Sequence, residues 1–222
     1  MESKFCTLSA ITLHIRGDMT GLRARQKEQR RQQIAEAALT MFKSHGFVAT
    51  TLDQIATQAG VSAPTVVNYF GGKQEILMAL LKAPDQKAMR EARARLDEHS
   101  DPLEALCSLE GLMTHYQLQA MPASLWRELA PFLLTGELSS ALQPWNAAVI
   151  EETKALLLHF QRLGKVRNDL DIDTAATLFN QYANVAFIRL ATEAEPDRAA
   201  HAQHMRRVLD LMCHGMLANP AA

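Results

Sequence analysis

The sequence has little of what disulfide scaffolds, zinc modules and membrane proteins need. Its 222 residues include only three cysteines, ten glycines and eight prolines. Cys6, Cys107 and Cys213 lie far apart and are odd in number, which argues against a disulfide framework and against a CxxC-type zinc site. We expect reduced thiols in a cytoplasmic protein, and a cysteine redox sensor is the alternative.

Long apolar runs are also missing from the sequence. No stretch approaches the ~20 apolar residues that cross a bilayer, so no membrane partner is predicted. The stretch "LSAITLHI", residues 8–15, is too short and too polar for the core of a signal peptide. We therefore expect residues 1–20 to form a flexible N-terminal arm, with Met19 as an alternative start.

The sequence motifs of common enzymes are absent. The stretch "FGGKQ", residues 70–74, lacks the GxxxxGK[ST] spacing of a phosphate loop, and neither GxSxG nor HExxH occurs. The stretch "DLDID", residues 169–173, lacks the glycine and the final glutamate of a calcium loop. The sequence therefore predicts no catalytic residue, no metal ligand and no cofactor, and we expect that the protein is not an enzyme.

The residues that are abundant favour helix. Alanine, leucine, glutamine, glutamate and arginine dominate, and apolar residues recur every three or four positions, which predicts an all-α fold. We expect Pro84 to kink or restart the helix that begins at Lys73, Pro131 to disturb a short helix around Trp126, and Pro144 to lie in a first helical turn. A further amphipathic helix is predicted in residues 25–47, where Gly46 closes it. The other helices are predicted over residues 52–59, 63–70, 103–119, 144–163, 174–194 and 197–217.

Charge is distributed unevenly along the chain. Between Met19 and Glu75 there are seven basic and four acidic residues, a net charge of +3, whereas residues 76–222 carry about −4. A basic N-terminal region on an acidic body indicates that the N-terminal region meets a polyanion.

The segment "TTLDQIATQAGVSAPTVVNYFGGKQEIL", residues 50–77, contains two short helices joined by a glycine turn. Gly60 turns the chain after the first helix, Ser62 caps the second, and Pro64 is acceptable in its first turn. This arrangement is a helix-turn-helix, whose second helix lies in the major groove of DNA.

The second helix has one face for the protein core and one for DNA. Val66 and Phe70 are four residues apart and should pack against Ile55, Phe42 and Phe47. The remaining face of that helix consists of Ala63, Pro64, Thr65, Val67, Asn68 and Tyr69.

The short side chains on this outer face suit base edges. Asn68 can bridge the N6 and N7 edge of adenine, and Val67 or Ala63 can contact a thymine methyl group.

Other residues around the helix suit phosphates. Thr65 and Tyr69 carry hydroxyl groups, while Thr51 and Lys73 stand at helix N-termini, where free N–H groups attract a phosphate. An arginine-rich stretch can add backbone or minor-groove contacts. Its basic residues are Arg23, Arg25, Lys27 and Arg30.

The same segment resembles the DNA-binding segment of the TetR family of bacterial transcriptional regulators. The shared pattern is a threonine pair, an "IA…AGVS" run, a helix that ends in an aromatic pair, and a lysine followed by an acid and an aliphatic residue. The preceding "MFKSHGF" is similar too, so the resemblance covers Arg30 to Leu81. It implies a three-helix DNA-binding domain at 21–81, joined by a connecting helix to a larger helical effector-binding and dimerisation domain at 82–222.

The resemblance also places the family's DNA contacts on this sequence. Val67 is a departure, because many members carry an aromatic residue there. The matching positions are Thr51, Ala63, Pro64, Thr65, Val67, Asn68, Tyr69 and Lys73.

One helix-turn-helix reads only a few base pairs, so we expect a homodimer on a near-palindromic double-stranded operator. In the resembling family, the last two helices form a four-helix interface with the second subunit. Their apolar residues in this sequence are Ala175, Leu178, Phe179, Tyr182, Ala186, Phe187, Val208, Leu211, Met212 and Met216.

The resemblance further implies a repressor that is released by a small-molecule effector. Ligand pockets are mostly apolar with a few polar groups, and the leucines and methionines of the larger domain favour a hydrophobic ligand. The candidate pocket residues are His115, Tyr116, Trp126, Phe132, Trp145, His159 and Phe160. The alternative is a helix-turn-helix protein that is controlled by a protein partner or by cysteine redox state.

Overall fold

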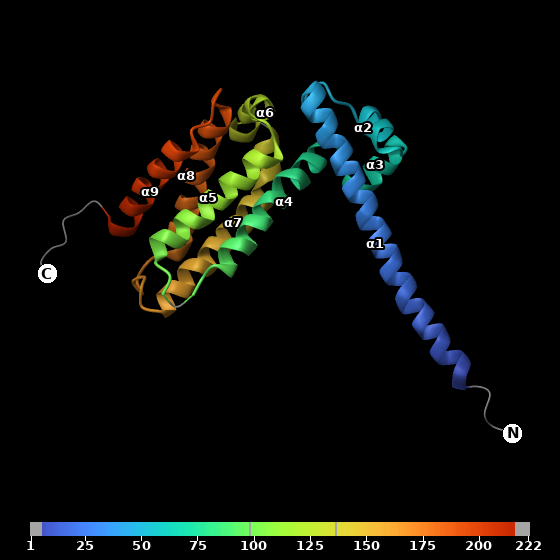
Figure 1. The fold of residues 1–222 in the computed structure, drawn as a ribbon, viewed down its shortest axis with the longest axis horizontal. Helices are drawn as coiled ribbons and strands as arrows, with labels where there is room; N and C mark the ends of the chain where they lie inside the picture. Colours follow the sequence, from blue (N-terminus) through green and yellow to red (C-terminus); the bar gives the residue numbers. More distant parts are fainter. Residues whose placement is uncertain (1–5, 98, 136, 216–222) are drawn as a thin grey trace, which may run out of the picture.

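The chain is built from helices. The computed structural model describes residues 6–97, 99–135 and 137–215, with side chains over 21–97, 99–133 and 143–215. These ranges contain nine α-helices and no strand (Figure 1). The helices are α1 (Cys6–His45), α2 (Leu52–Ala59), α3 (Ala63–Phe70), α4 (Lys73–Ala94), α5 (Pro102–Ala120), α6 (Ala123–Thr135), α7 (Glu137–Arg162), α8 (Ile172–Thr192) and α9 (Arg198–His214). The all-α fold class predicted from the sequence is confirmed.

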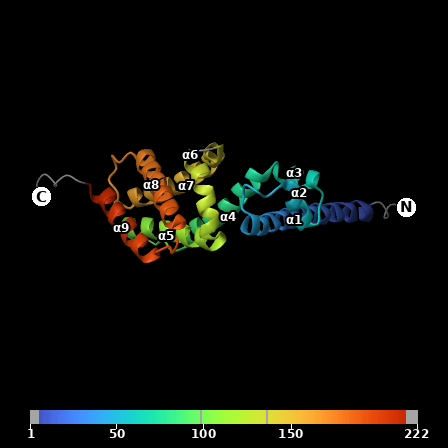
Figure 2. The same cartoon turned by 90° about the horizontal axis from the view of Figure 1, so that it is seen from above.

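The helices form two groups joined by α4. Helices α1 to α3 lie at one end of the molecule and α5 to α9 form a bundle at the other, with α4 between them (Figures 1 and 2). One apolar cluster runs through this junction, since it contains Phe42 of α1, Leu81 of α4 and Trp126 of α6. The proposed domain boundary between residues 81 and 82 thus falls inside a helix and inside a shared core.

Helix α1 has a clear buried stripe in its C-terminal half. Ile34, Ala38 and Phe42 are spaced by four residues and are at most 1% exposed. They pack in one cluster with Ile55 of α2 and Val66 of α3. Burying a side chain of this size contributes about 1.5–3 kcal/mol, so this small core holds the three helices together.

The N-terminal part of α1 differs from the sequence expectation of a flexible arm over 1–20. The structure extends the helix back to Cys6, and residues 1–5 lie outside the described ranges. This part of α1 projects away from the other helices (Figure 1), and residues 21–30 are exposed throughout. Within residues 21–45, tertiary packing therefore supports α1 only from about Arg31 onward, and most helical stability in proteins comes from a packed apolar face.

Pro84, Pro131 and Pro144 all lie inside helices, which corrects the first-turn position expected for Pro144 and the alternative that a new helix starts at Pro84. Pro84 lies within α4, Pro131 within α6 and Pro144 within α7, so each of these helices continues on both sides of its proline. In α4 the reason is visible, because buried Leu81 precedes Pro84 and buried Ala88 follows it. Packing of both halves against the body offsets the hydrogen bond that Pro84 cannot donate.

The bundle has a second apolar core. It is built from α5, α7, α8 and α9, with Leu109, Phe160 and Phe179 each no more than 2% exposed. Among the described residues, no helix has both the length and the apolar character to cross a membrane.

Candidate DNA interface and effector cavity

Helices α2 and α3 form a tightly capped pair. Thr51 accepts a hydrogen bond from the Gln54 N–H, and the Gln54 side chain accepts one from the Thr51 N–H, which completes a capping box for α2. Gly60 has φ 65° and ψ 35°, the left-handed conformation that ends α2. Ser62 caps α3 by accepting from the Thr65 N–H. The predicted helix-turn-helix geometry is therefore present.

Helix α3 turns one face inward and one outward. Val66 is fully buried and Phe70 is 9% exposed, and both join the cluster of Phe42, Phe47 and Ile55 as predicted. On the other face Val67 is 45% exposed, and Pro64 and Asn68 are exposed as well.

The remaining members of the predicted reading face are less open. Ala63 and Tyr69 are half-buried against the core, and the Thr65 hydroxyl lies 2.8 Å from the Ser62 hydroxyl. Thr51, at the start of α2, is exposed. Val67 and Asn68 near the middle of α3 thus have the freest side chains for contact with a base edge.

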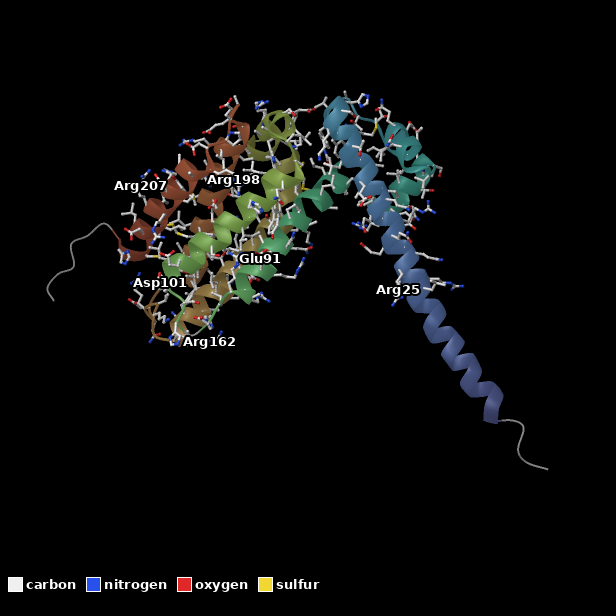
Figure 3. All side chains as sticks on the ribbon, in the orientation of Figure 1. Arg25, Glu91, Asp101, Arg162, Arg198 and Arg207 are labelled. Carbon is white, nitrogen blue, oxygen red and sulfur yellow. The ribbon has the colours of Figure 1, made fainter. Side chains whose placement is uncertain are left out.

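A wide groove runs between α3 and the projecting part of α1. Its volume is about 740 Å³, and its walls carry positive charge and amide groups. The lining residues are Arg23, Gln26, Lys27, Gln29, Arg30, Gln33, Asn68 and Tyr69. Three of the four predicted arm residues therefore meet Asn68 in one place. Arg25, labelled in Figure 3, lies on the same part of α1 but does not line the groove.

Arg31 fixes the end of α3 against α1. Its Nη1 donates a 2.7 Å hydrogen bond to the Tyr69 carbonyl oxygen, and its guanidinium lies 4.2 Å from the centroid of the Phe70 ring. The bond satisfies a carbonyl in the last turn of α3, where a helix has no partner of its own. Arg31 was not among the residues predicted from the sequence.

Lys73 has a different environment from the predicted phosphate contact. Its Nζ donates to the carbonyl oxygens of Phe47, Val48 and Thr50 at 2.7, 3.1 and 2.8 Å. An ammonium group has three protons, so these bonds occupy all of its donors. Burial lowers the pKa of Lys73, and the nearby Glu128 carboxylate opposes this shift. The side chain therefore braces residues 47–50 through three main-chain carbonyl groups.

Glu128 of α6 holds the same segment from the side of the bundle. Its Oε2 accepts from the Phe47 N–H at 3.0 Å, and its Oε1 accepts from the Val48 N–H at 2.7 Å. The carboxylate lies so close that a Cβ on Gly46 would be 2.7 Å from Oε2. Because hydrogen bonds to an ionised acceptor are roughly twice as strong as neutral ones, Glu128 is a firm polar link between the two groups of helices.

The bundle contains a cavity of about 450 Å³ between α4, α5, α6, α7 and α8. Aromatic walls come from Trp126, Trp145 and Phe187, and polar walls from Asp85, Glu110 and a few amides. The remaining lining residues are Leu81, Met113, Thr114, Gln117, Leu133, Asn146, Gln181, Ala183, Asn184, Val185 and Ile188.

Buried polar groups in the cavity wall are only partly paired. Gln117 donates from Nε2 to the Leu81 carbonyl at 2.8 Å and to Asp85 Oδ1 at 3.0 Å, while its own Oε1 has no partner among the residues that the structure describes. Among the same residues, the indole nitrogens of Trp126 and Trp145 also lack partners. Burial raises the pKa of Asp85 to about 7, and the hydrogen bond from Gln117 opposes the shift.

Two of the seven predicted pocket residues line this cavity, Trp126 and Trp145. The histidine and tyrosine of α5 lie elsewhere, because His115 pairs with Arg198 at 2.8 Å and the Tyr116 hydroxyl donates to Glu91. The face of α5 that meets the cavity consists instead of Glu110, Met113, Thr114 and Gln117, which are spaced by three or four residues.

The other three predicted pocket residues are placed differently. Phe132 is 40% exposed, and its neighbour Leu133 lines the cavity in its place. Phe160 is fully buried in the second core. His159 lines a separate hollow of about 210 Å³ beside Arg93 and Glu152.

Exposed apolar side chains mark the last two helices. Leu178 and Val185 of α8 and Leu211 of α9 are about half exposed, at 50%, 52% and 48%. Among the predicted interface residues, Phe179 and Ala186 instead face the interior of the bundle. Met216 lies outside the described residues.

Comparison with known proteins identifies the family of this fold. Residues 34–80 match the model of "Bacterial regulatory proteins, tetR family". The transcriptional regulator RutR of Escherichia coli strain K12 is 32% identical over 154 residues, which cover 66% of this chain and 69% of RutR. The chain belongs to the TetR family.

Similarity to two other TetR-family proteins covers a smaller part of the chain in sequence than in fold. The transcriptional regulator HbdR of Aromatoleum is 38% identical over 80 residues, and the match spans 36% of this chain but only 35% of HbdR. A solved structure of FadR from Thermus thermophilus, a TetR-family repressor in complex with lauroyl-CoA, aligns with a TM-score of 0.67 and 25% identity. That alignment covers 86% of this chain and 97% of FadR.

The structure adds residues to the site of this TetR-family chain that the sequence did not reveal. Gln26, Gln29 and Gln33 were missed, although with Arg23 and Arg30 they recur at the three- and four-residue spacing of one helix face. Asp85 was missed as well, although it lies four residues after buried Leu81 and therefore in phase with the apolar stripe of α4. Glu128 has no comparable signal, because its partners are about 80 residues away in sequence.

The two cysteines whose side chains are described do not have the surroundings of redox sensors. Burial raises the pKa of Cys107 and also that of Cys213. Reactive cysteines are thiolates in electropositive surroundings, so the raised pKa values argue against control by these two residues. The side chain of Cys6 lies outside the description.

Proposed function

We propose that the protein is a dimeric transcriptional repressor that binds a near-palindromic operator and is released by a small molecule in the bundle cavity. The observation that carries this proposal is the outward face of α3 beside the basic groove of α1. A reading helix next to a positively charged track is what sequence-specific DNA binding requires.

In this proposal α3 enters the major groove with Asn68 and Val67 against base edges. Ala63, Pro64 and Thr65 bring the start of the helix close to DNA, and Tyr69 contributes from its end. Thr51 and the first N–H groups of α4 at Lys73 contact phosphates on either side. The basic residues Arg23, Lys27 and Arg30 in the groove, and Arg25 beside it, neutralise the backbone.

The second subunit packs on α8 and α9 in this proposal. Large apolar side chains that stay half exposed in a monomer, as Leu178 and Leu211 do, are typical of an interface. Two subunits related by a twofold axis then present two copies of α3 to half-sites about one DNA turn (~34 Å) apart.

The cavity supports an effector in preference to a protein partner, because a solid bundle core would offer a small molecule no space. Its volume of about 450 Å³ falls in the range of ligand pockets, roughly 300–1,000 Å³. The binding of lauroyl-CoA by Thermus FadR supports a small-molecule site in this fold.

Helix α6 connects the cavity with the DNA-binding helices. Trp126 and Leu133 line the cavity, and Glu128 between them binds the main chain at Phe47 and Val48. A ligand that favours a different position of α6 therefore also favours a different position of α1 to α3. The population of dimers whose two α3 helices match the operator then falls.

Binding selection from random duplexes, followed by footprinting on the DNA beside its own gene, tests this proposal. We expect a near-palindromic sequence, protected on one face of the duplex by a protein dimer. The variant Asn168→Ala, which changes an exposed residue in the connection between α7 and α8, should select the same sequence as wild type. If the protein binds all duplexes with equal affinity at modest salt, and none more tightly than bulk competitor DNA, the proposal is contradicted.

A further inference from the structure

The bundle cavity has walls that discriminate between classes of small molecule by charge. Two of its sixteen described lining residues are ionisable, Asp85 and Glu110, and both are acids. No lysine, arginine or histidine occurs among these described lining residues. Residues 134–142, which follow Leu133 and whose side chains are outside the description, contain no basic residue in the sequence either.

The two acids have different partners. Glu110 accepts from the Thr114 hydroxyl at 2.7 Å and lies 2.7 Å from His201 Nε2, so a titratable base already faces it. Asp85, which is 2% exposed, bonds to the neutral amide of Gln117 at 3.0 Å. A carboxylate buried with a neutral partner is costly, and a cation beside it would remove most of that cost.

The groups around Asp85 leave further hydrogen-bonding capacity in the cavity. Gln117 is 4% exposed, and its Oε1, an acceptor, has no partner among the described side chains. The N–H donors of Trp126 and Trp145 also lack partners within the described part of the chain. With Phe187, these rings provide aromatic faces that attract cations. An ion with N–H protons would satisfy Asp85 and Gln117 together, while an apolar body would cover the rings.

From this arrangement we infer that the effector is a protonated amine with an apolar or aromatic body, held by Asp85 and Gln117 at its ammonium end. The inference rests on the proposed function, because it assigns a ligand class to the cavity in which the effector is proposed to bind. It also distinguishes this chain from Thermus FadR, since the phosphates of an acyl-CoA would here meet two acidic groups and no basic one among the described lining residues.

The charge state of Asp85 agrees with this assignment. Burial raises the pKa of its carboxyl group to about 7, so a large fraction of the empty cavities hold it protonated at neutral pH. The bound ammonium favours the carboxylate, and the displaced proton passes to solvent.

The two tryptophans of the chain allow binding to be measured directly, because Trp126 and Trp145 both line the cavity. The probes are 4-phenylbutylamine, 4-phenylbutanol and 4-phenylbutyrate, which share one body and differ in the charge of the head, together with lauroyl-CoA. Each is titrated into the full-length protein at pH 7.5 while tryptophan fluorescence is recorded. We expect the amine to bind about 10-fold more tightly than the alcohol, because hydrogen bonds to charged groups are the stronger class. The carboxylate and the acyl-CoA should bind more weakly than the alcohol.

Two variants locate the ammonium site. Asp85→Asn keeps an acceptor for Gln117 and should bring the amine and the alcohol to equal affinity, while the alcohol itself binds as before. Asp169→Asn is the matched control, because the Asp169 side chain is 78% exposed and lies outside the cavity lining. It should retain the 10-fold preference.

The outcomes separate this inference from the proposed function. Tighter binding of the carboxylate or of lauroyl-CoA would overturn the inference, and so would the absence of binding by all four probes or an unchanged preference in Asp85→Asn. Operator binding is measured independently on the same samples. If operator binding is normal while the amine preference is absent, the ligand class is wrong and DNA binding stands. If the amine binds as expected while no duplex is preferred, the cavity assignment stands and the repressor proposal fails.

Discussion

The groove between α1 and α3 presents its basic and amide side chains to solvent, whereas the bundle buries Asp85 and Glu110 almost completely. The exposed groups cost nothing to keep charged, so they can follow a flexible and highly charged partner such as a DNA backbone. The buried groups are held in a low-dielectric cavity, where each unpaired polar atom strongly favours a ligand that offers the matching hydrogen-bond donor or acceptor. One end of the chain is therefore suited to affinity for a polymer, and the other to discrimination between small molecules.

The largest expected effect on operator binding concerns assembly, which makes the two ends of the molecule depend on each other. The double variant Leu178→Glu, Leu211→Glu places charges on the exposed apolar face of α8 and α9. It should be monomeric by light scattering and bind operator about 100-fold more weakly, because the second half-site no longer binds as part of one molecule. A dimer of wild-type affinity would show that other residues form the interface.

A second effect follows from the buried acid of the bundle. The pKa of about 7 for Asp85, compared with 3.8 for the free side chain, means that the folded protein binds more protons than the unfolded chain between about pH 4 and 7. The contribution of Asp85 to stability should fall as the pH rises through this window and stay level above it, while carboxylates with lowered pKa values, such as Glu104 and Asp171, act in the opposite direction. Asp85→Asn removes the fall and should raise the free energy of unfolding at pH 8 by up to about 4 kcal/mol.

Urea unfolding at pH 5 and pH 8 measures this difference. Asp169→Asn, which changes an exposed carboxylate, should follow wild type at both values. An equal pH dependence in Asp85→Asn and wild type would show that the Asp85 carboxyl is not the group responsible.

At the DNA-binding end, Asn68→Ala should cost about 1–3 kcal/mol on specific DNA and relax the preference at one base pair. Binding to a matrix of single-base operator variants measures this change, with Asn168→Ala as the control. A uniform loss over all sequences would instead assign Asn68 to backbone contact.

The link between the two ends should be visible in hydrogen exchange. Glu128→Gln replaces a carboxylate that accepts from the Phe47 and Val48 N–H groups by an amide with one acceptor oxygen. Exchange at these two amides should accelerate about 10-fold, since hydrogen bonds to charged acceptors are worth more than neutral ones. The control Glu195→Gln changes an exposed residue in the connection between α8 and α9 and should leave both exchange rates unchanged. Exchange rates in Glu128→Gln equal to those of wild type would show that Glu128 does not link the two groups of helices.

The smallest effect separates two lysines at the DNA-binding end. Lys27→Ala should lower the slope of log affinity against log salt by about 1, because the residue lines the open groove. Lys73→Ala should leave the slope unchanged and reduce stability, because its ammonium is occupied by three carbonyl oxygens. An equal drop in slope for both variants would return Lys73 to the phosphate contacts.

The DNA-binding end could be predicted closely because its signals are local. Gly60 marks the turn, and Val66 and Phe70 mark the buried face of α3, since both depend on positions only a few residues apart. The use of Lys73 could not be predicted, because its partners lie 23 to 26 residues earlier and become neighbours only in the folded core.

The cavity was harder to predict because aromatic content does not show which face of a helix is buried. Trp126 and Trp145 line it, but His115 and Tyr116 lie on another face of α5, although Thr114 and Gln117 on either side of them in sequence line the cavity. The buried Asp85 and Gln117 resemble surface residues in composition, and only packing from five helices makes them part of a wall.

Pro84 gives α4 a built-in joint at the edge of the cavity. It cannot donate to the Leu80 carbonyl, so the helix lacks one rung immediately before Asp85, and bending is easiest there. From Pro84 back to Lys73 the helix extends over eleven residues, or about 16 Å at 1.5 Å per residue. A change of about 10° in the angle at this joint would carry the far end through about 3 Å, a displacement as long as a hydrogen bond.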